Sequence, residues 1–136
     1  GQYDAIILDA FSSDAIPVHL LTREAISMYL DKLAPGGILL VHISNRYLDL
    51  EPVLALAANE LGLSARLRDD VGDHADRDPG VLTNGSEWVA LSRLEGDLGS
   101  LLLSTDWYRL RPSDKVRLWT DDYTDIWSVL SWRNPD

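Results

Sequence analysis

The sequence contains no cysteine, which excludes disulfide bonds, thiolate nucleophiles and cysteine-ligated metal sites. This absence is compatible with a reducing compartment, and we expect a cytoplasmic protein. Basic residues are also scarce: 12 Lys and Arg stand against 22 Asp and Glu, and the formal net charge is -10. Nucleic-acid phosphates and anionic membrane surfaces repel such a chain, so we expect neither as a partner, whereas cationic ligands remain open.

Long apolar runs are lacking too. No stretch approaches the roughly 20 apolar residues that a membrane helix needs, and no internal repeat or low-complexity segment is present. Hydrophobic residues nevertheless make up 46% of the 136 residues, which is enough for one core. We therefore expect a single domain that spans residues 1–136.

A buried-looking strand near the start of the sequence leads into a polar loop. Ile6–Leu8 is a short continuous apolar run, typical of a parallel strand covered on both faces. Asp9 ends this run, and Ser12, Ser13 and Asp14 follow shortly after it. Ligands of α/β sheets bind beyond the carboxyl ends of the strands, so these side chains are candidates for a binding crevice. The alternative is that Asp9 caps a turn and the other three form an Asx or Ser turn.

A helix with one buried face is expected next. Thr22 is a candidate N-cap, and Pro35–Gly37 is a candidate stop signal. The apolar positions between them have the i, i+3, i+4, i+7 spacing of a helix and are Ile26, Tyr29, Leu30 and Leu33.

A second strand and polar loop repeat the pattern. Ile38–Ile43 is again a continuous apolar run, and Asn45, Arg46 and Tyr47 follow it. These three side chains either contact a substrate or cap the loop. His42 lies inside the run, where a hydrogen-bonded core histidine is favoured over a catalytic base.

Further elements complete half of a doubly wound α/β domain. A second helix is expected from about Leu50 to Leu61, with Asp49 as its cap and Gly62 as its stop. Ser64–Arg68 and Trp88–Ser92 are two more strand candidates.

The remaining polar and aromatic segments have less specific patterns. Asp70–Asp78 includes His74, but a solvated acidic loop is favoured there, and no metal site is expected. Leu94–Leu103 could form a short helix that glycines weaken. Trp107–Arg109 and Trp119–Tyr123 mix aromatic and charged residues, and packing on the sheet is favoured over a substrate lip.

Three segments together resemble the spermidine synthase family of polyamine aminopropyltransferases, and most closely its bacterial spermidine-synthase-like members, which are often fused to membrane segments. The similarity covers nearly the whole chain. The segments are Tyr3–Thr22, Val41–Tyr47 and Trp119–Tyr123.

The resemblance implies an α/β fold with a partial Rossmann-like sheet of the S-adenosylmethionine-methyltransferase type, with helices on its faces and an antiparallel last strand. It implies transfer of an aminopropyl group from decarboxylated S-adenosylmethionine to a polyamine such as putrescine. Asp9 matches the aspartate that accepts the amine proton. Asp14 matches the one that holds a substrate ammonium, and we place Ser12 and Ser13 with it as substrate-binding residues; Asn45 and Tyr47 join them from the second polar loop.

The same resemblance predicts that the chain is the carboxyl-terminal half of such a domain. The glycine-rich turn and the acidic residue that hold the nucleoside would lie outside it, so we expect no firm cofactor binding and no activity from these residues alone. An exposed edge strand at residues 3–9 would then favour a homo-oligomer. A membrane segment attached to a longer parent protein is a further expectation. Two alternatives stay open: a noncatalytic polyamine-binding or regulatory domain, and an S-adenosylmethionine-dependent methyltransferase.

Overall fold

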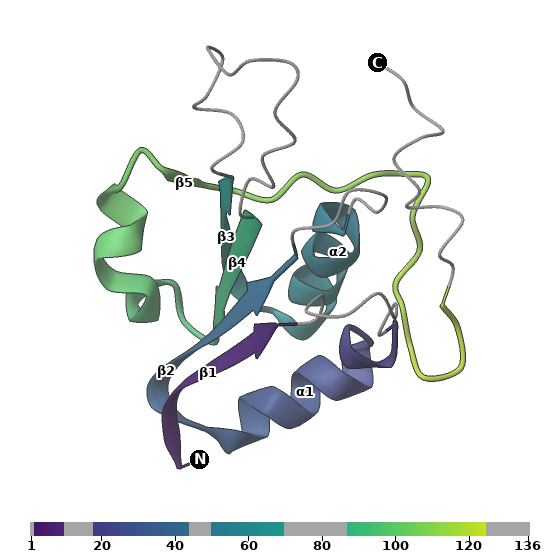
Figure 1. The fold of residues 1–136 in the computed structure, drawn as a ribbon, viewed down its shortest axis with the longest axis horizontal. Helices are drawn as coiled ribbons and strands as arrows, with labels where there is room; N and C mark the ends of the chain where they lie inside the picture. Colours follow the sequence, from purple (N-terminus) through teal and green to yellow (C-terminus); the bar gives the residue numbers. More distant parts are fainter. Residues whose placement is uncertain (1, 10–17, 44–49, 70–86, 125–136) are drawn as a thin grey trace, which may run out of the picture.

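The computed structural model describes residues 2–9, 18–43, 50–69 and 87–124, which form a mixed α/β fold (Figure 1). None of the helices in these ranges is both long and apolar enough to cross a membrane. The elements in chain order are β1 Tyr3–Asp9, the 3-10 helix η1 Val18–Leu20, α1 Arg23–Lys32, β2 Leu33–His42, α2 Glu51–Leu61, β3 Ser64–Asp69, β4 Glu87–Ser92, the 3-10 helix η2 Glu95–Leu103, and β5 Trp107–Tyr108.

The described strands form one five-stranded mixed sheet in the order β1-β2-β4-β3-β5. β1 and β2 pair in parallel, whereas β4 runs antiparallel to both of its neighbours, β2 and β3. β1, β2 and β3 therefore point the same way, and β4 is inserted between two of them in the opposite direction. The short β5 pairs antiparallel with β3. The expected α/β class is thus confirmed, with the antiparallel strand in the interior of the sheet.

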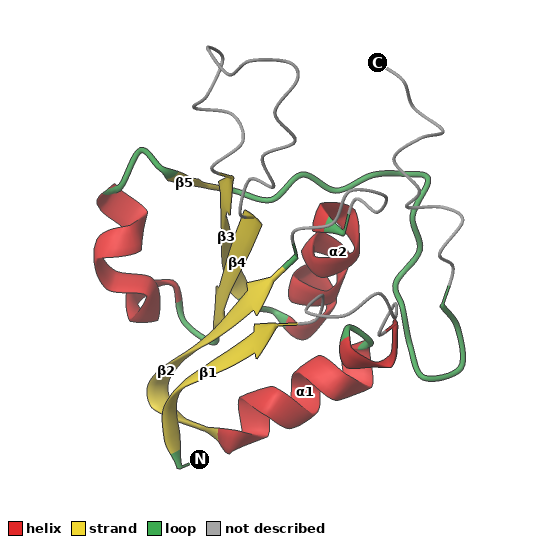
Figure 2. Cartoon of the chain, in the orientation of Figure 1, coloured by secondary structure: helices red, strands yellow, loops and turns green. Residues whose placement is uncertain are grey.

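Helices lie on both faces of this sheet (Figure 2). Alternate residues of β2 and β4, such as Val41 and Val89, point toward α1 and α2 and join Ile26 and Leu54 in the main hydrophobic cluster. On the other face η2 contacts β2, β3 and β4. Its Leu98 is buried outside that main cluster. Apolar side chains are therefore buried on both faces of the sheet at its centre.

The start of α1 follows the prediction, and its end does not. Thr22 is the N-cap, and its hydroxyl accepts a hydrogen bond from the backbone N–H of Ala25 at 3.2 Å. The helix ends at Lys32, before the predicted stop at Pro35–Gly37. Leu33 is already extended, because it pairs with β1 as the first residue of β2. The three residues of the predicted stop lie instead in an irregularity of that strand.

Glycine is required in this irregularity for lack of space. A Cβ at Gly37 would lie 2.9 Å from the backbone oxygen of Ala34 and 3.1 Å from two side-chain carbons of Leu33. The neighbouring Gly36 has a φ of +81°, in the left-handed region that other residues avoid. The turn-forming residues were therefore correctly recognised, but they shape a strand rather than end a helix.

α2 occupies Glu51–Leu61, close to the predicted span. Its N-cap is Leu50, which makes no side-chain capping bond, and the candidate cap Asp49 lies outside the described residues. Gly62 ends the helix as predicted, in a left-handed conformation with a φ of 68°.

The chain after η2 returns to pack on α1. Trp119 is 1% exposed, which confirms the prediction that this aromatic residue packs rather than forming a lip. The Thr22 hydroxyl donates to Asp121 Oδ1 at 2.7 Å, and the Asp121 backbone N–H donates to Glu24 Oε2 at 2.9 Å. The hydrogen bond from its own backbone N–H, together with the one from Asp121, lowers the pKa of Glu24 against the opposing effect of burial. Asp121, which is distant in sequence, thus makes hydrogen bonds to the N-cap and to the first turn of α1.

β1 lies at one end of the described sheet and pairs there with β2 alone. Two of its large apolar side chains are exposed, Ile7 to 66% and Tyr3 to 53%. An edge strand with an apolar outer surface is a template for pairing with another chain. We therefore retain the prediction of self-association through this edge.

Ile7→Lys is expected to abolish that self-association, because a charge on an edge strand disfavours strand addition. Sedimentation velocity over a range of concentrations will show a wild-type chain whose average mass rises with concentration and an Ile7→Lys variant that stays monomeric. Met28→Lys is the matched control, since Met28 is also exposed but lies on α1. A wild-type chain that is monomeric at every concentration would contradict the prediction.

Candidate functional site

Asp9 and His42 form a pair at the carboxyl ends of two neighbouring parallel strands. They are the last residues of β1 and β2 and lie directly opposite one another in the register. The distance from Asp9 Oδ1 to His42 Nδ1 is 3.1 Å. The Asp9 side chain is 51% exposed and the His42 side chain 22%, so a ligand can approach the carboxylate while the imidazole is largely enclosed.

The imidazole is supported from its other side by an aromatic ring. Trp88 of β4 is the register partner of His42, and the two ring centroids are 4.7 Å apart at an interplanar angle of 32°. Arg68 of β3 is in turn opposite Trp88, and Trp107 of β5 is opposite Arg68. One residue from each strand therefore lies in a row across the described sheet, and Asp9 and His42 are the first two members of this row.

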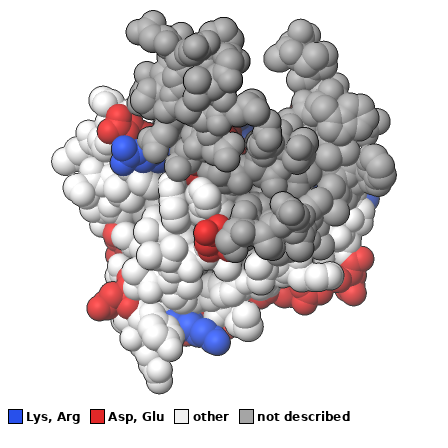
Figure 3. All heavy atoms as spheres, viewed as in Figure 1, with Lys and Arg blue, Asp and Glu red and all other residues white. Residues whose placement is uncertain are grey.

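This arrangement can bind a cation and accept a proton. When His42 carries its proton on Nδ1, that N–H donates to Asp9 and orients the carboxylate. A carboxylate at the rim of a sheet attracts an ammonium group and is a general base for it at short range. The net charge of the chain, -10, also favours a cationic over an anionic ligand. On the face drawn in Figure 3, acidic side chains are visible at more places than basic ones.

Of the site residues predicted from the sequence, Asp9 is the one that the structure places. Ser12, Ser13 and Asp14 lie in 10–17 and Asn45 and Tyr47 in 44–49, outside the described residues.

His42 was not among the predicted site residues. The interpretation as a hydrogen-bonded histidine is confirmed, but its partner is Asp9, and the side chain lies at the strand end rather than in the core. A signal for the pair was present in the sequence, because two parallel strands that each end in a polar residue bring those residues together if they are neighbours.

Metal binding has no support in the part of the chain that the structure describes, where no three His, Asp or Glu side chains are grouped for coordination. The acidic stretch around His74 lies outside the described residues.

No protein-family model, curated protein or solved structure was found to match this chain. The geometry of the site is therefore what a functional proposal must rest on.

Proposed function

We propose that the chain belongs to a spermidine-synthase-like transferase, which moves an aminopropyl group from decarboxylated S-adenosylmethionine to a polyamine such as putrescine. The observation that carries the proposal is the Asp9–His42 pair at the carboxyl ends of β1 and β2. Carboxyl ends of parallel strands are where α/β enzymes bind their ligands. The exposed carboxylate supplies the base that this reaction requires.

The reaction needs a base because an alkylamine has a pKa of about 10 and is mostly protonated at neutral pH. Asp9 accepts the proton from the ammonium, and the nitrogen lone pair then forms a bond to the carbon next to the sulfonium. The carbon–sulfur bond breaks, and its electron pair leaves with the sulfur as methylthioadenosine. In this scheme His42 is a positioning residue that orients the carboxylate through the 3.1 Å contact.

The sheet supports the same proposal at the level of the fold. Three strands run in parallel, and one antiparallel strand is inserted between the last two of them. We interpret this order as a partial Rossmann-like sheet of the methyltransferase type. In the proposed enzyme Asp14, Ser12 and Ser13 hold the distal ammonium and the loop around it, and Asn45 and Tyr47 line the acceptor site from the end of β2.

The nucleoside end of the donor is assigned to no described residue. A nucleoside site of this type needs a glycine-rich turn between a strand end and a helix. Gly36 and Gly37 have a different place, within the strand β2. We therefore propose that the described residues supply the acceptor half of the site.

The test is a methylthioadenosine-release assay with decarboxylated S-adenosylmethionine and, in turn, putrescine, cadaverine and spermidine. It is run on the longest gene product that contains these residues and on residues 1–136 alone. We expect release that depends on one of the amines from the former and none from the latter. Amine binding without turnover would instead indicate a binding or regulatory domain. Consumption of ordinary S-adenosylmethionine without methylthioadenosine release would indicate a methyltransferase.

A further inference from the structure

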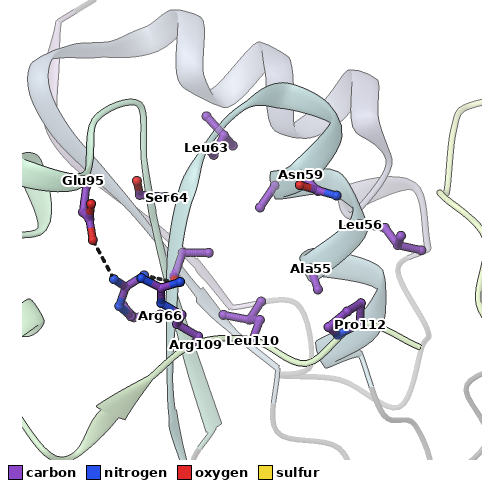
Figure 4. Close-up of a pocket in the computed structure, with 12 residues that line it drawn as sticks. Ala55, Leu56, Asn59, Leu63, Ser64, Arg66, Glu95, Arg109, Leu110 and Pro112 are labelled. Carbon is purple, nitrogen blue, oxygen red and sulfur yellow. Dashed lines mark hydrogen bonds and ion pairs between the residues drawn. The ribbon is translucent and has the colours of Figure 1, made fainter. Parts of the chain in front are cut away.

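A hollow lies toward the end of the sheet that is remote from Asp9. It is an open hollow with a volume of about 430 Å³, bordered by α2, the first half of β3, the start of η2 and the segment 109–112 (Figure 4). β2, β4 and β3 follow β1 in the sheet order, so β3 lies three strand spacings, about 14 Å, from Asp9 of β1 and two spacings from His42 of β2. Its volume is within the range of small-molecule sites.

One wall of the hollow carries a guanidinium that is held in place. Arg66 of β3 has a side chain only 13% exposed, and its Nη1 donates to the backbone oxygen of Ala65 at 2.8 Å. Its Nη2 lies 3.0 Å from Glu95 Oε1 of η2, as the dashed line in Figure 4 marks. The carboxylate of Glu95 therefore neutralises this first positive charge.

A second guanidinium next to it is not neutralised. Leu67 and Tyr108 are the last bridged pair of β3 and β5, so the following positions on the two strands are Arg66 and Arg109. Both line the hollow. No acidic side chain in the described part of the chain pairs with Arg109. Arg109 therefore carries the uncompensated positive charge of this hollow, and the head group of an anion would neutralise it.

The remaining walls combine apolar side chains with the polar side chains of Asn59, Ser64 and Glu95. Leu56 of α2 and Leu63, Leu110 and Pro112 line the hollow beside the two arginines. Apolar walls with a few convergent polar groups are typical of small-molecule sites. We propose that this hollow binds a small organic carboxylate with a hydrocarbon tail, whose head group pairs with Arg109 and whose tail contacts the leucines.

The chemistry of the arginine selects this class of ligand. A guanidinium presents a planar fork of donors that matches a carboxylate through two parallel hydrogen bonds. A polyamine would be repelled by the same group, so this hollow and the Asp9 site take ligands of opposite charge. The inference is thus independent of the proposed transferase function.

The experiment is an NMR titration of the ¹⁵N-labelled chain with hexanoate, 1-hexanol and acetate at one pH and ionic strength. Hexanoate is expected to shift the backbone amides of residues that line the hollow, such as Ser64 and Leu110. 1-Hexanol, which lacks the charge, and acetate, which lacks the tail, are each expected to bind at least about tenfold more weakly.

Three variants make the test specific. Arg109→Gln is expected to weaken hexanoate binding by about tenfold. Arg111→Gln removes the same charge from an exposed residue that does not line the hollow, and should change the affinity less than about twofold. Glu95→Gln removes the competing carboxylate and should strengthen binding by about threefold. The proposal is overturned if hexanoate leaves these amides unshifted, if 1-hexanol binds as tightly, or if Arg109→Gln binds hexanoate like the wild type.

Discussion

Substituting Asp9 with asparagine is expected to lower the rate of aminopropyl transfer by about 10²–10⁴-fold, the range that general-base catalysis supplies. The amide is nearly isosteric with the carboxylate, but it cannot take a proton from an ammonium group. It can still accept the hydrogen bond from His42 Nδ1, so the 3.1 Å contact that orients the side chain is retained. The loss should therefore fall on kcat, while amine binding weakens less.

The matched control for this variant is Asp4→Asn. Asp4 is also an exposed aspartate of β1, and it lies near the opposite end of the strand from Asp9. Both variants remove one negative charge, so a general electrostatic effect on a cationic substrate would appear in both. Methylthioadenosine release should collapse in Asp9→Asn alone. If the Asp9→Asn variant keeps its turnover with any acceptor amine, Asp9 is not the general base.

β1 and β2 could be predicted from the sequence because their apolar runs are continuous and end in polar residues. Ile38–Ile43 falls almost wholly within β2, and Ser64–Arg68 is one residue short of β3. The end of α1 could not be predicted in this way. Pro35–Gly37 is a strong local signal for a helix stop, but Leu33 leaves the helix earlier because it pairs with Tyr3. A distant partner overrides the local preference at that point.

Half of the candidate site was missed for a related reason. Asp9 was recognisable as the polar end of an apolar run, although the prediction that this strand is covered on both faces was wrong, because β1 lies at the sheet edge with Ile7 exposed. His42 becomes its partner only through the parallel register of β1 and β2, and Trp88 supports His42 only because β4 lies on the other side of β2. Arg66 and Arg109 are likewise brought together by the short β3–β5 pairing. Composition and spacing along one strand do not specify which strands are neighbours.

The glycines in the sequence correctly predicted that the helix at η2 is weak and irregular. Gly96 and Gly99 weaken a helix there, and the segment forms a 3-10 helix with a kink at Gly99, where φ is +55°. The kink leaves Leu98 buried against the sheet, and Leu103 89% exposed. The short helix was thus predicted at the correct place, while its irregular form follows from the left-handed residue in its middle.

Replacing Trp119 with alanine is expected to lower the free energy of unfolding by about 3–5 kcal/mol, the usual cost of truncating a buried aromatic residue. Trp119 is 1% exposed and belongs to the main hydrophobic cluster. Its backbone oxygen accepts from the Arg23 N–H at 2.8 Å, which ties the segment to the first turn of α1. The cavity left by the ring would weaken this connection as well, and chemical denaturation followed by far-UV circular dichroism measures the loss.

A second substitution separates the packing of the ring from its polar atom. The indole Nε1 of Trp119 is buried and has no hydrogen-bond partner among the described residues. Trp119→Phe removes this unsatisfied donor and keeps most of the apolar contact, so the two effects partly cancel and the loss should stay below about 1.5 kcal/mol. Trp107→Ala, at a half-buried tryptophan of β5, should cost less than Trp119→Ala. Equal losses for Trp119→Phe and Trp119→Ala would mean that a hydrogen bond of the indole, rather than its packing, stabilises this end of the fold.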